Sequence, residues 1–152
     1  MSLLKEHQEI YKALNRNRVK YLVIGGVAVM AYGIPRFTLD LDILIEPTLD
    51  NCRKALKSLN EAGLNRASKL APEVILEATM YTIMGDITVD ILCGVRLSDF
   101  NEMWARKSIK YLENVKVNII SIEDLIKTKK YTDRLKDKED IEILEKISRG
   151  EL

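Results

Sequence analysis

The sequence has few of the residues that mark unusual protein classes. It contains two cysteines, three prolines and one histidine in 152 residues. Cys52 and Cys93 lie far apart without a Cys-x-x-Cys pattern, so we expect buried apolar thiols and neither a zinc site nor a disulfide framework. No repeat, low-complexity run or Pro/Gly/Ser-rich linker interrupts the chain. These absences predict one domain over residues 1–152.

Long apolar runs and an excess of one charge are also lacking. No stretch approaches the ~20 apolar residues that span a membrane, and the N-terminus has no apolar core of a signal peptide. The formal net charge is +1, from 24 basic and 23 acidic side chains, which excludes a broad attraction to nucleic acid or an anionic membrane. We therefore expect a cytoplasmic globular protein that holds any polyanion with a local patch.

The lone histidine excludes a mechanism that needs several. Apolar residues recur at helical spacing between Ser2 and Asn15, and His7 falls on the apolar face of this predicted helix. A single histidine in such a place is more often a core residue than a catalyst.

A strand, a glycine pair and a helix follow in that order. Val19 to Ile24 is a β-rich run, Gly25 and Gly26 come next, and residues 27–32 are predicted to be a short helix. Two glycines allow another backbone or a phosphate to come close, and a helix N-terminus favours anions. The alternative is a tight turn where the helix packs on its strand.

The next β-rich run, residues 35–47, is interrupted by two aspartates. Strand alternation puts Arg36, Thr38, Asp40 and Asp42 on one face if the strand extends that far. The Cα atoms of two such aspartates would lie roughly 6.6 Å apart. Both carboxylates could then bind one divalent cation or a pair about 4 Å apart, and Mg²⁺ favours such oxygens together with phosphates. A solvated edge strand and an ion pair between Arg36 and Asp40 are the alternatives.

Further along the chain, Thr48 is predicted to cap a helix that runs to about Ala62. Residues 64–78 are consistent with either a helix that begins at Pro72 or a strand that begins at Val74, so we leave them unassigned. Residues 79–92 predict a hairpin, and two short strands are expected at 109–112 and 115–120. Ser121 should cap a last helical region.

A third aspartate, Asp90, lies within the apolar second strand of the predicted hairpin. An ionised carboxylate between Val89 and Ile91 needs a cation, a basic side chain or several N–H donors. The alternative to a metal is a structural ion pair with Arg36 or Arg96.

Taken together, these features resemble the DNA polymerase β-like nucleotidyltransferase superfamily. The resemblance rests on Gly25-Gly26, thirteen intervening residues, Asp40-x-Asp42 and the distant strand aspartate Asp90, and covers roughly residues 19–92. Gly26 stands where many members have serine. Arg36-x-Thr38 looks like the version in small bacterial and archaeal members, in which both residues would be part of the nucleotide site.

The C-terminal part also looks like the tail of toxin-type and antibiotic-type minimal members. The similarity lies in residues 125–129, Arg134 and Lys136-Asp137-x-x-Asp140. By that similarity Lys129 is the candidate for binding the triphosphate. Because Lys129 continues an apolar helical stripe, the alternative is that it extends along the surface to solvent.

The resemblance implies an α/β nucleotidyltransferase fold, a mixed β-sheet with helices packed on it and a short helical C-terminus. It also implies that Asp40, Asp42 and Asp90 hold Mg²⁺ or Mn²⁺ against a nucleoside triphosphate, whose monophosphate passes to an unknown acceptor hydroxyl, on protein or tRNA for example. Gly25 and Gly26 would then cradle the phosphates. A partner protein or homodimer could complete so small a site, in a toxin–antitoxin setting by resemblance. A catalytically silent nucleotide- or partner-binding protein of the same fold, and an unrelated structural domain, are the alternatives.

Overall fold

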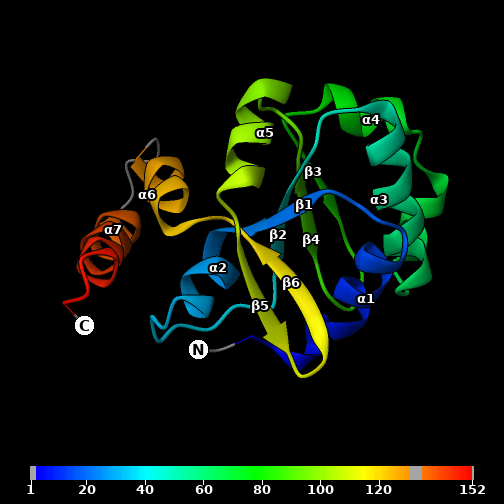
Figure 1. Ribbon diagram of the computed structural model, residues 1–152. Helices are drawn as coiled ribbons and strands as arrows, with labels where there is room; N and C mark the ends of the chain where they lie inside the picture. The colour runs from blue at the N-terminus through cyan, green and yellow to red at the C-terminus, as the bar shows by residue number, and fades with distance from the viewer. Residues whose placement is uncertain (1–2, 131–134, 152) are drawn as a thin grey trace.

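A mixed six-stranded sheet forms the centre of the protein in this computed structural model, which describes residues 3–130 and 135–151 (Figure 1). The strand order is β3-β4-β2-β1-β6-β5. The strands are β1 (Tyr21–Ile24), β2 (Leu41–Ile45), β3 (Met80–Ile83), β4 (Val89–Leu92), β5 (Ser108–Leu112) and β6 (Val115–Ile119).

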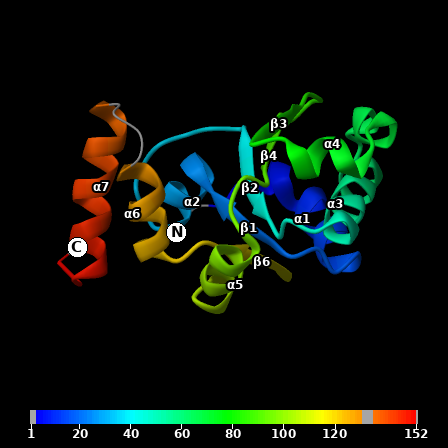
Figure 2. The ribbon, with the colours of Figure 1, turned by 90° about the horizontal axis from the view of Figure 1, so that it is seen from above.

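Helices lie on both sides of this sheet, α1, α3 and α4 on one side and α2, α6 and α7 on the other (Figure 2). The α-helices are α1 (Gln8–Arg16), α2 (Gly25–Ala31), α3 (Leu49–Glu61), α4 (Pro72–Glu77), α5 (Leu97–Ala105), α6 (Ile122–Lys130) and α7 (Leu135–Ser148). Two 3-10 turns, η1 (Lys5–His7) and η2 (Asn65–Lys69), precede α1 and α4. The α/β class and the mixed sheet predicted from the sequence are confirmed.

The central strands are buried on both faces, and this is why their sequences are nearly continuous apolar runs. All four residues of β1 are buried, and in β2 only Asp42 is partly exposed. β1 pairs antiparallel with β2 and parallel with β6, while β2 pairs parallel with β4. This arrangement places β2 between β1 and β4, so a polar side chain on β2 lies beside the ends of both neighbours.

Local signals explain several helix starts. The Thr48 side chain accepts a hydrogen bond from the Asn51 N–H at 3.2 Å and caps α3, as predicted. Ser121 does the same for the Asp124 N–H at 3.1 Å at the start of α6. Pro72 opens α4, so the helical reading of residues 72–77 is correct and the strand reading from Val74 is wrong.

The hairpin and the strands after it are also confirmed. β3 and β4 pair antiparallel with Thr82 opposite Asp90, and β5 and β6 form the second hairpin. His7 is fully buried, as its apolar face predicted, and its Nε2 lies 2.7 Å from the Leu39 carbonyl oxygen. Because a carbonyl oxygen can only accept, the Nε2–H of His7 donates this hydrogen bond, and burial lowers the pKa of the ring.

One prediction about β2 needs correction. The strand begins at Leu41, and residues 34–40 approach it as irregular chain. Arg36, Thr38 and Asp40 therefore do not share a strand face with Asp42. Two hydrogen bonds fix the segment before β2. His7 Nε2 bonds the Leu39 carbonyl oxygen from a distant part of the chain, and the Thr38 hydroxyl accepts a hydrogen bond from the Asp40 N–H.

Among the described residues, no helix combines the length and the apolar character needed to cross a membrane.

Candidate active site

Two of the three predicted aspartates meet on adjacent strands. Asp42 on β2 and Asp90 on β4 are direct partners in the parallel register, and Asp90 is close enough to raise the pKa of the Asp42 carboxyl group. Both side chains are partly buried. Residues at the same level of neighbouring strands project to the same face of a sheet, so the fold itself brings these two carboxylates together.

The surroundings of Asp42 make its carboxyl group harder to ionise. Burial is the largest cause that raises the pKa of Asp42, to about 7, followed by the hydrogen bond and the negative charge of Asp90. The charge of Asp40 adds to the effect, and the charge of Lys129 opposes it. Two carboxylates this close cannot both ionise without cost unless a cation compensates them.

Asp40 stands apart from this pair. It precedes β2, its side chain is exposed, and it acts on Asp42 only through its charge. Within residues 3–130 and 135–151, no group of three or more His, Cys, Asp or Glu side chains is gathered closely enough to hold a metal ion. The structure thus assembles a carboxylate pair with a third carboxylate nearby, and not a closed set of three ligands.

The Thr82 hydroxyl fixes the orientation of Asp90. It donates a short hydrogen bond to Asp90 Oδ1 from the neighbouring strand β3. Sequence reasoning missed Thr82, although the predicted hairpin contained the signal: once the turn length is known, Thr82 is the residue opposite Asp90. Arg96, the basic partner considered for Asp90, pairs with Asp99 instead at 3.0 Å.

Gly25 makes room for Asp42. It lies at the end of β1, opposite the Asp42 end of β2, and has a φ of +64°. A Cβ at this position would collide with the Asp42 carboxylate. Both the backbone conformation and the space therefore require glycine here. The sequence predicts that the glycine pair admits another backbone or a phosphate. In the structure, the group that comes close to Gly25 is the Asp42 carboxylate.

Gly26 is packed by the segment that leads into β2. A Cβ on Gly26 would lie 2.9 Å from the Thr38 methyl group and 3.7 Å from Arg36 Nη2. Arg36 and Thr38 are thus brought to the start of α2, although neither belongs to β2. Four of the predicted nucleotide-site residues, Gly25, Gly26, Arg36 and Thr38, therefore lie together beside Asp42.

Arg36 is held by an aspartate from the far end of the chain. Its Nη1 contacts Asp140 Oδ2 on α7, and both side chains are largely buried. The predicted alternative, an ion pair with Asp40, is not formed. The Nε of Arg36 is buried and has no hydrogen-bond partner among the described residues. One guanidinium N–H thus remains without an acceptor in the described part of the chain.

Lys129 belongs to the same cluster. Its ammonium lies 3.2 Å from both Asp137 Oδ1 and Asp140 Oδ2 and is nearly inaccessible to solvent. The alternative that Lys129 extends along the surface to solvent is therefore wrong. Lys129 is close enough to lower the pKa of Asp42, although it makes no ion pair with it. Arg134, which the resemblance also included, lies outside the described residues.

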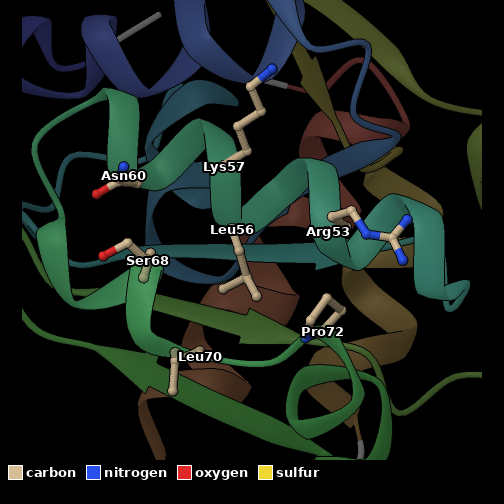
Figure 3. A pocket seen from close by; sticks show the side chains of 8 residues that line it. Arg53, Leu56, Lys57, Asn60, Ser68, Leu70 and Pro72 are labelled. Carbon is tan, nitrogen blue, oxygen red and sulfur yellow. The ribbon is translucent and has the colours of Figure 1, made fainter.

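A separate hollow of about 310 Å³ lies over α3, η2 and α4 (Figure 3). Leu56 extends from α3 toward Leu70 and Pro72 there, whereas Lys57 extends away from them (Figure 3). No candidate residue of the aspartate site lines this hollow. The aspartates and glycines singled out from the sequence therefore lie at the central strands β1, β2 and β4, and not at this hollow.

Comparisons with known proteins agree with this fold. A crystal structure of a "putative nucleotidyltransferase" from Thermotoga maritima matches with a TM-score of 0.57 and 17% sequence identity, over 93% of this chain and 89% of that one. At that identity the likeness shows the fold. The curated proteins contain no match. A family model matches residues 1–149, nearly the whole chain. The protein therefore belongs to the family described as nucleotidyltransferases of unknown function, DUF6036.

Proposed function

We propose that this protein transfers a nucleoside monophosphate from a nucleoside triphosphate to an acceptor hydroxyl, with a divalent cation held by Asp42 and Asp90. The observation that carries the proposal is the uncompensated pair itself. Two carboxylates are held together at the cost of a raised pKa, and no basic side chain of the described residues lies within ion-pair distance of either. A divalent cation removes that cost.

The donor set suits a hard cation. Carboxylate oxygens are the protein ligands that Mg²⁺ and Mn²⁺ prefer, and Mg²⁺ usually keeps waters or substrate phosphates as its other ligands. Two protein carboxylates are sufficient for such a site, and the nearby negative charge of Asp40 would add to its attraction for a cation. A cation bound here would neutralise charge on the triphosphate and on the atoms that react.

The surrounding residues have separate roles in this proposal. Gly25 keeps the space around Asp42 Oδ2 open, and Thr82 holds Asp90 by its Oδ1. Arg36 supplies positive charge at the start of α2, with its Nε–H available to a phosphate oxygen. Lys129 adds a second positive charge close to Asp42.

The reaction needs a proton acceptor as well as a phosphate site. The acceptor oxygen forms a bond to the α-phosphorus, the bond from that phosphorus to the bridging oxygen breaks, and pyrophosphate leaves. The proton of the attacking hydroxyl passes to a carboxylate oxygen of the Asp42–Asp90 pair.

A catalytically silent nucleotide-binding protein of the same fold is the second candidate. It is favoured by the exposed position of Asp40 outside the carboxylate pair and by the ion pairs that already engage Arg36 and Lys129. The two candidates differ in whether a nucleoside monophosphate is transferred to an acceptor. A toxin–antitoxin setting remains a prediction from the resemblance.

The test measures binding and transfer separately. Wild type and Asp42→Asn are titrated calorimetrically with ATP, GTP, CTP and UTP, with Mg²⁺ and with EDTA. The same proteins are then incubated with α-labelled triphosphates and a broad set of RNA and protein acceptors. Metal-dependent binding with label transfer, both lost in Asp42→Asn, is expected. Binding without transfer or pyrophosphate release would favour the silent protein, and no binding at all would contradict both candidates.

A further inference from the structure

The two cysteines of the chain meet in the core. Cys52 lies in the first turn of α3, and Cys93 follows the last residue of β4. Their sulfur atoms are 3.8 Å apart, although 41 positions separate the residues in sequence. Both thiols are free and buried, with Cys52 fully enclosed and Cys93 4% exposed. The sequence expectation of buried thiols is confirmed, but their contact was not foreseen.

We propose that Cys52 and Cys93 are a site of reversible oxidation and close to an intramolecular disulfide when the folded protein meets a peroxide. A disulfide bond is about 2.05 Å long, so each sulfur must move by only about 1 Å from its present position. Both residues lie at element boundaries, one at the first turn of a helix and the other beyond the end of a strand, where small backbone shifts are tolerated best. This proposal is independent of the nucleotidyltransferase chemistry.

The pair is not symmetric. Cys93 is the thiol with some exposure, and its hydrogen bond with Cys52 lowers the pKa of Cys93, although burial opposes that effect. The same contact and burial raise the pKa of Cys52. Because the thiolate is the nucleophile, Cys93 is the sulfur that attacks the oxidant and Cys52 is the one that resolves the product.

The chemistry balances with the peroxide as the oxidant. The Cys93 thiolate attacks one peroxide oxygen, the O–O bond breaks, and Cys93 becomes a sulfenic acid while the second oxygen leaves as water or an alcohol. Cys52 then loses its proton and attacks the Cys93 sulfur, and the sulfenic oxygen leaves as water. Two thiols thus give two electrons to the peroxide, and two hydrogens leave the protein.

Oxidation would join α3 to the strand that carries Asp90. Asp90 lies three residues before Cys93, and side chains alternate along β4, so the carboxylate and the thiol project to opposite faces of the sheet. The disulfide would therefore stiffen the end of β4 without occupying the carboxylate face. We expect a higher melting temperature for the oxidised protein and its reversal by a dithiol reductant.

The test treats the reduced, folded protein with hydrogen peroxide and follows intact mass, while circular dichroism confirms that the chain stays folded. We expect a loss of two hydrogen masses per chain and, after proteolysis, one peptide that links Cys52 to Cys93. Cys52→Ala should instead give a Cys93 sulfenic acid that dimedone traps. Cys93→Ala is the matched control, in which neither product forms at the wild-type rate.

Three results would overturn the proposal. These are folded wild type that keeps both thiols, wild type that gains oxygen at single cysteines without a crosslink, and a crosslink between two chains in place of one within a chain. If either alanine variant fails to fold, the linked peptide and the reductant-reversible melting shift of wild type still decide the question.

Discussion

Two pairs of aspartates lie close together in this protein, and their surroundings differ. Asp137 and Asp140 on α7 both contact Lys129, and Asp140 also contacts Arg36. Asp42 and Asp90 are partners on adjacent strands, and the Thr82 hydroxyl donates a hydrogen bond to Asp90. No basic side chain of the described residues lies within ion-pair distance of either aspartate. The α7 pair is thus compensated within the protein. The sheet pair carries an unbalanced charge, and this imbalance is what we connect with a cation.

The same contacts hold α7 near the start of α2. Asp140 on α7 contacts both Lys129 on α6 and Arg36, and Arg36 lies beside Gly26 at the start of α2. Asp137 and Asp140 therefore hold the positive side chains of Arg36 and Lys129 near Asp42. Substitutions should distinguish the two aspartate pairs. Changes to Asp42 or Asp90 should mainly reduce catalytic activity, whereas changes to the aspartates of α7 should mainly reduce the free energy of unfolding.

The largest effect is expected for Asp90→Asn. This change removes one of the two carboxylates proposed to hold the cation. Pyrophosphate release from a triphosphate, measured with water or an added acceptor, should slow on the order of 1000-fold, which corresponds to about 4 kcal/mol. The control is Asp86→Asn, an exposed aspartate in the loop of the same hairpin. Equal activity of the Asp90 and Asp86 variants would contradict the assignment.

Next in size is Asp140→Asn. Removing the charge that Arg36 and Lys129 share leaves buried cations without full compensation, so the free energy of unfolding should fall by about 3 kcal/mol. Urea denaturation measures it. Glu139→Gln, an exposed neighbour on α7, should change stability by less than about 0.5 kcal/mol. If both variants are equally stable, the α7 pair does not hold the helix in place.

A smaller effect is expected for Gly25→Ala. The positive φ alone should cost about 1–2 kcal/mol of stability, and the new methyl group would collide with Asp42. Gly33→Ala is the matched control, because Gly33 also has a positive φ but nothing within 4 Å of its Cβ position. Both variants should lose stability in thermal melts. Only Gly25→Ala should also lose metal-dependent triphosphate binding, and an equal loss in Gly33→Ala would remove the steric argument.

The smallest effect is a pH dependence of stability in metal-free protein. Because the pKa of Asp42 is raised from 3.8 to about 7 on folding, the folded state holds an extra proton between these values. Its contribution is therefore unfavourable at high pH and fades as the pH falls. The full shift would correspond to about 3 kcal/mol between pH 4.5 and 7.5, and solvent screening of this partly exposed group reduces the expected loss of stability to about 1–2 kcal/mol.

The matched variant for that experiment is Asp42→Asn. It keeps the shape of the side chain and removes its titration, so the difference in unfolding free energy between wild type and variant isolates Asp42 from other carboxylates. The variant should be the more stable protein at pH 7.5, with a difference that shrinks toward pH 4.5. A difference that does not vary with pH would show that burial and Asp90 do not raise the pKa of Asp42.

Sequence alone was sufficient for the parts of the fold that local patterns determine. The Thr48 cap, the hairpin that carries Asp90 and the strand before Gly25 follow from capping chemistry and from runs of apolar residues. Helix α5 carried no prediction, although Leu97, Phe100 and Trp104 recur at helical spacing and could have indicated it.

The site was predictable in its residue types and less so in its geometry. The resemblance was enough to group Asp42 with Asp90. The exposed position of Asp40 depends on where β2 begins, which the sequence did not show. The segment before β2 is held by a contact between His7 and Leu39, which are 32 positions apart. The pairing of Arg36 with Asp140 spans 104 positions. No local pattern encodes such contacts, since they arise only when the helices pack.

The most direct measurement of the central claim is a calorimetric titration of metal-free protein with Mn²⁺ at pH 7 in two buffers of different ionisation enthalpy. Wild type should bind Mn²⁺ saturably and release protons, because the cation displaces the proton shared by Asp42 and Asp90. The double variant Asp42→Asn, Asp90→Asn should lose both the binding and the buffer dependence. Unchanged Mn²⁺ binding by that variant, or no binding by wild type, would contradict the account.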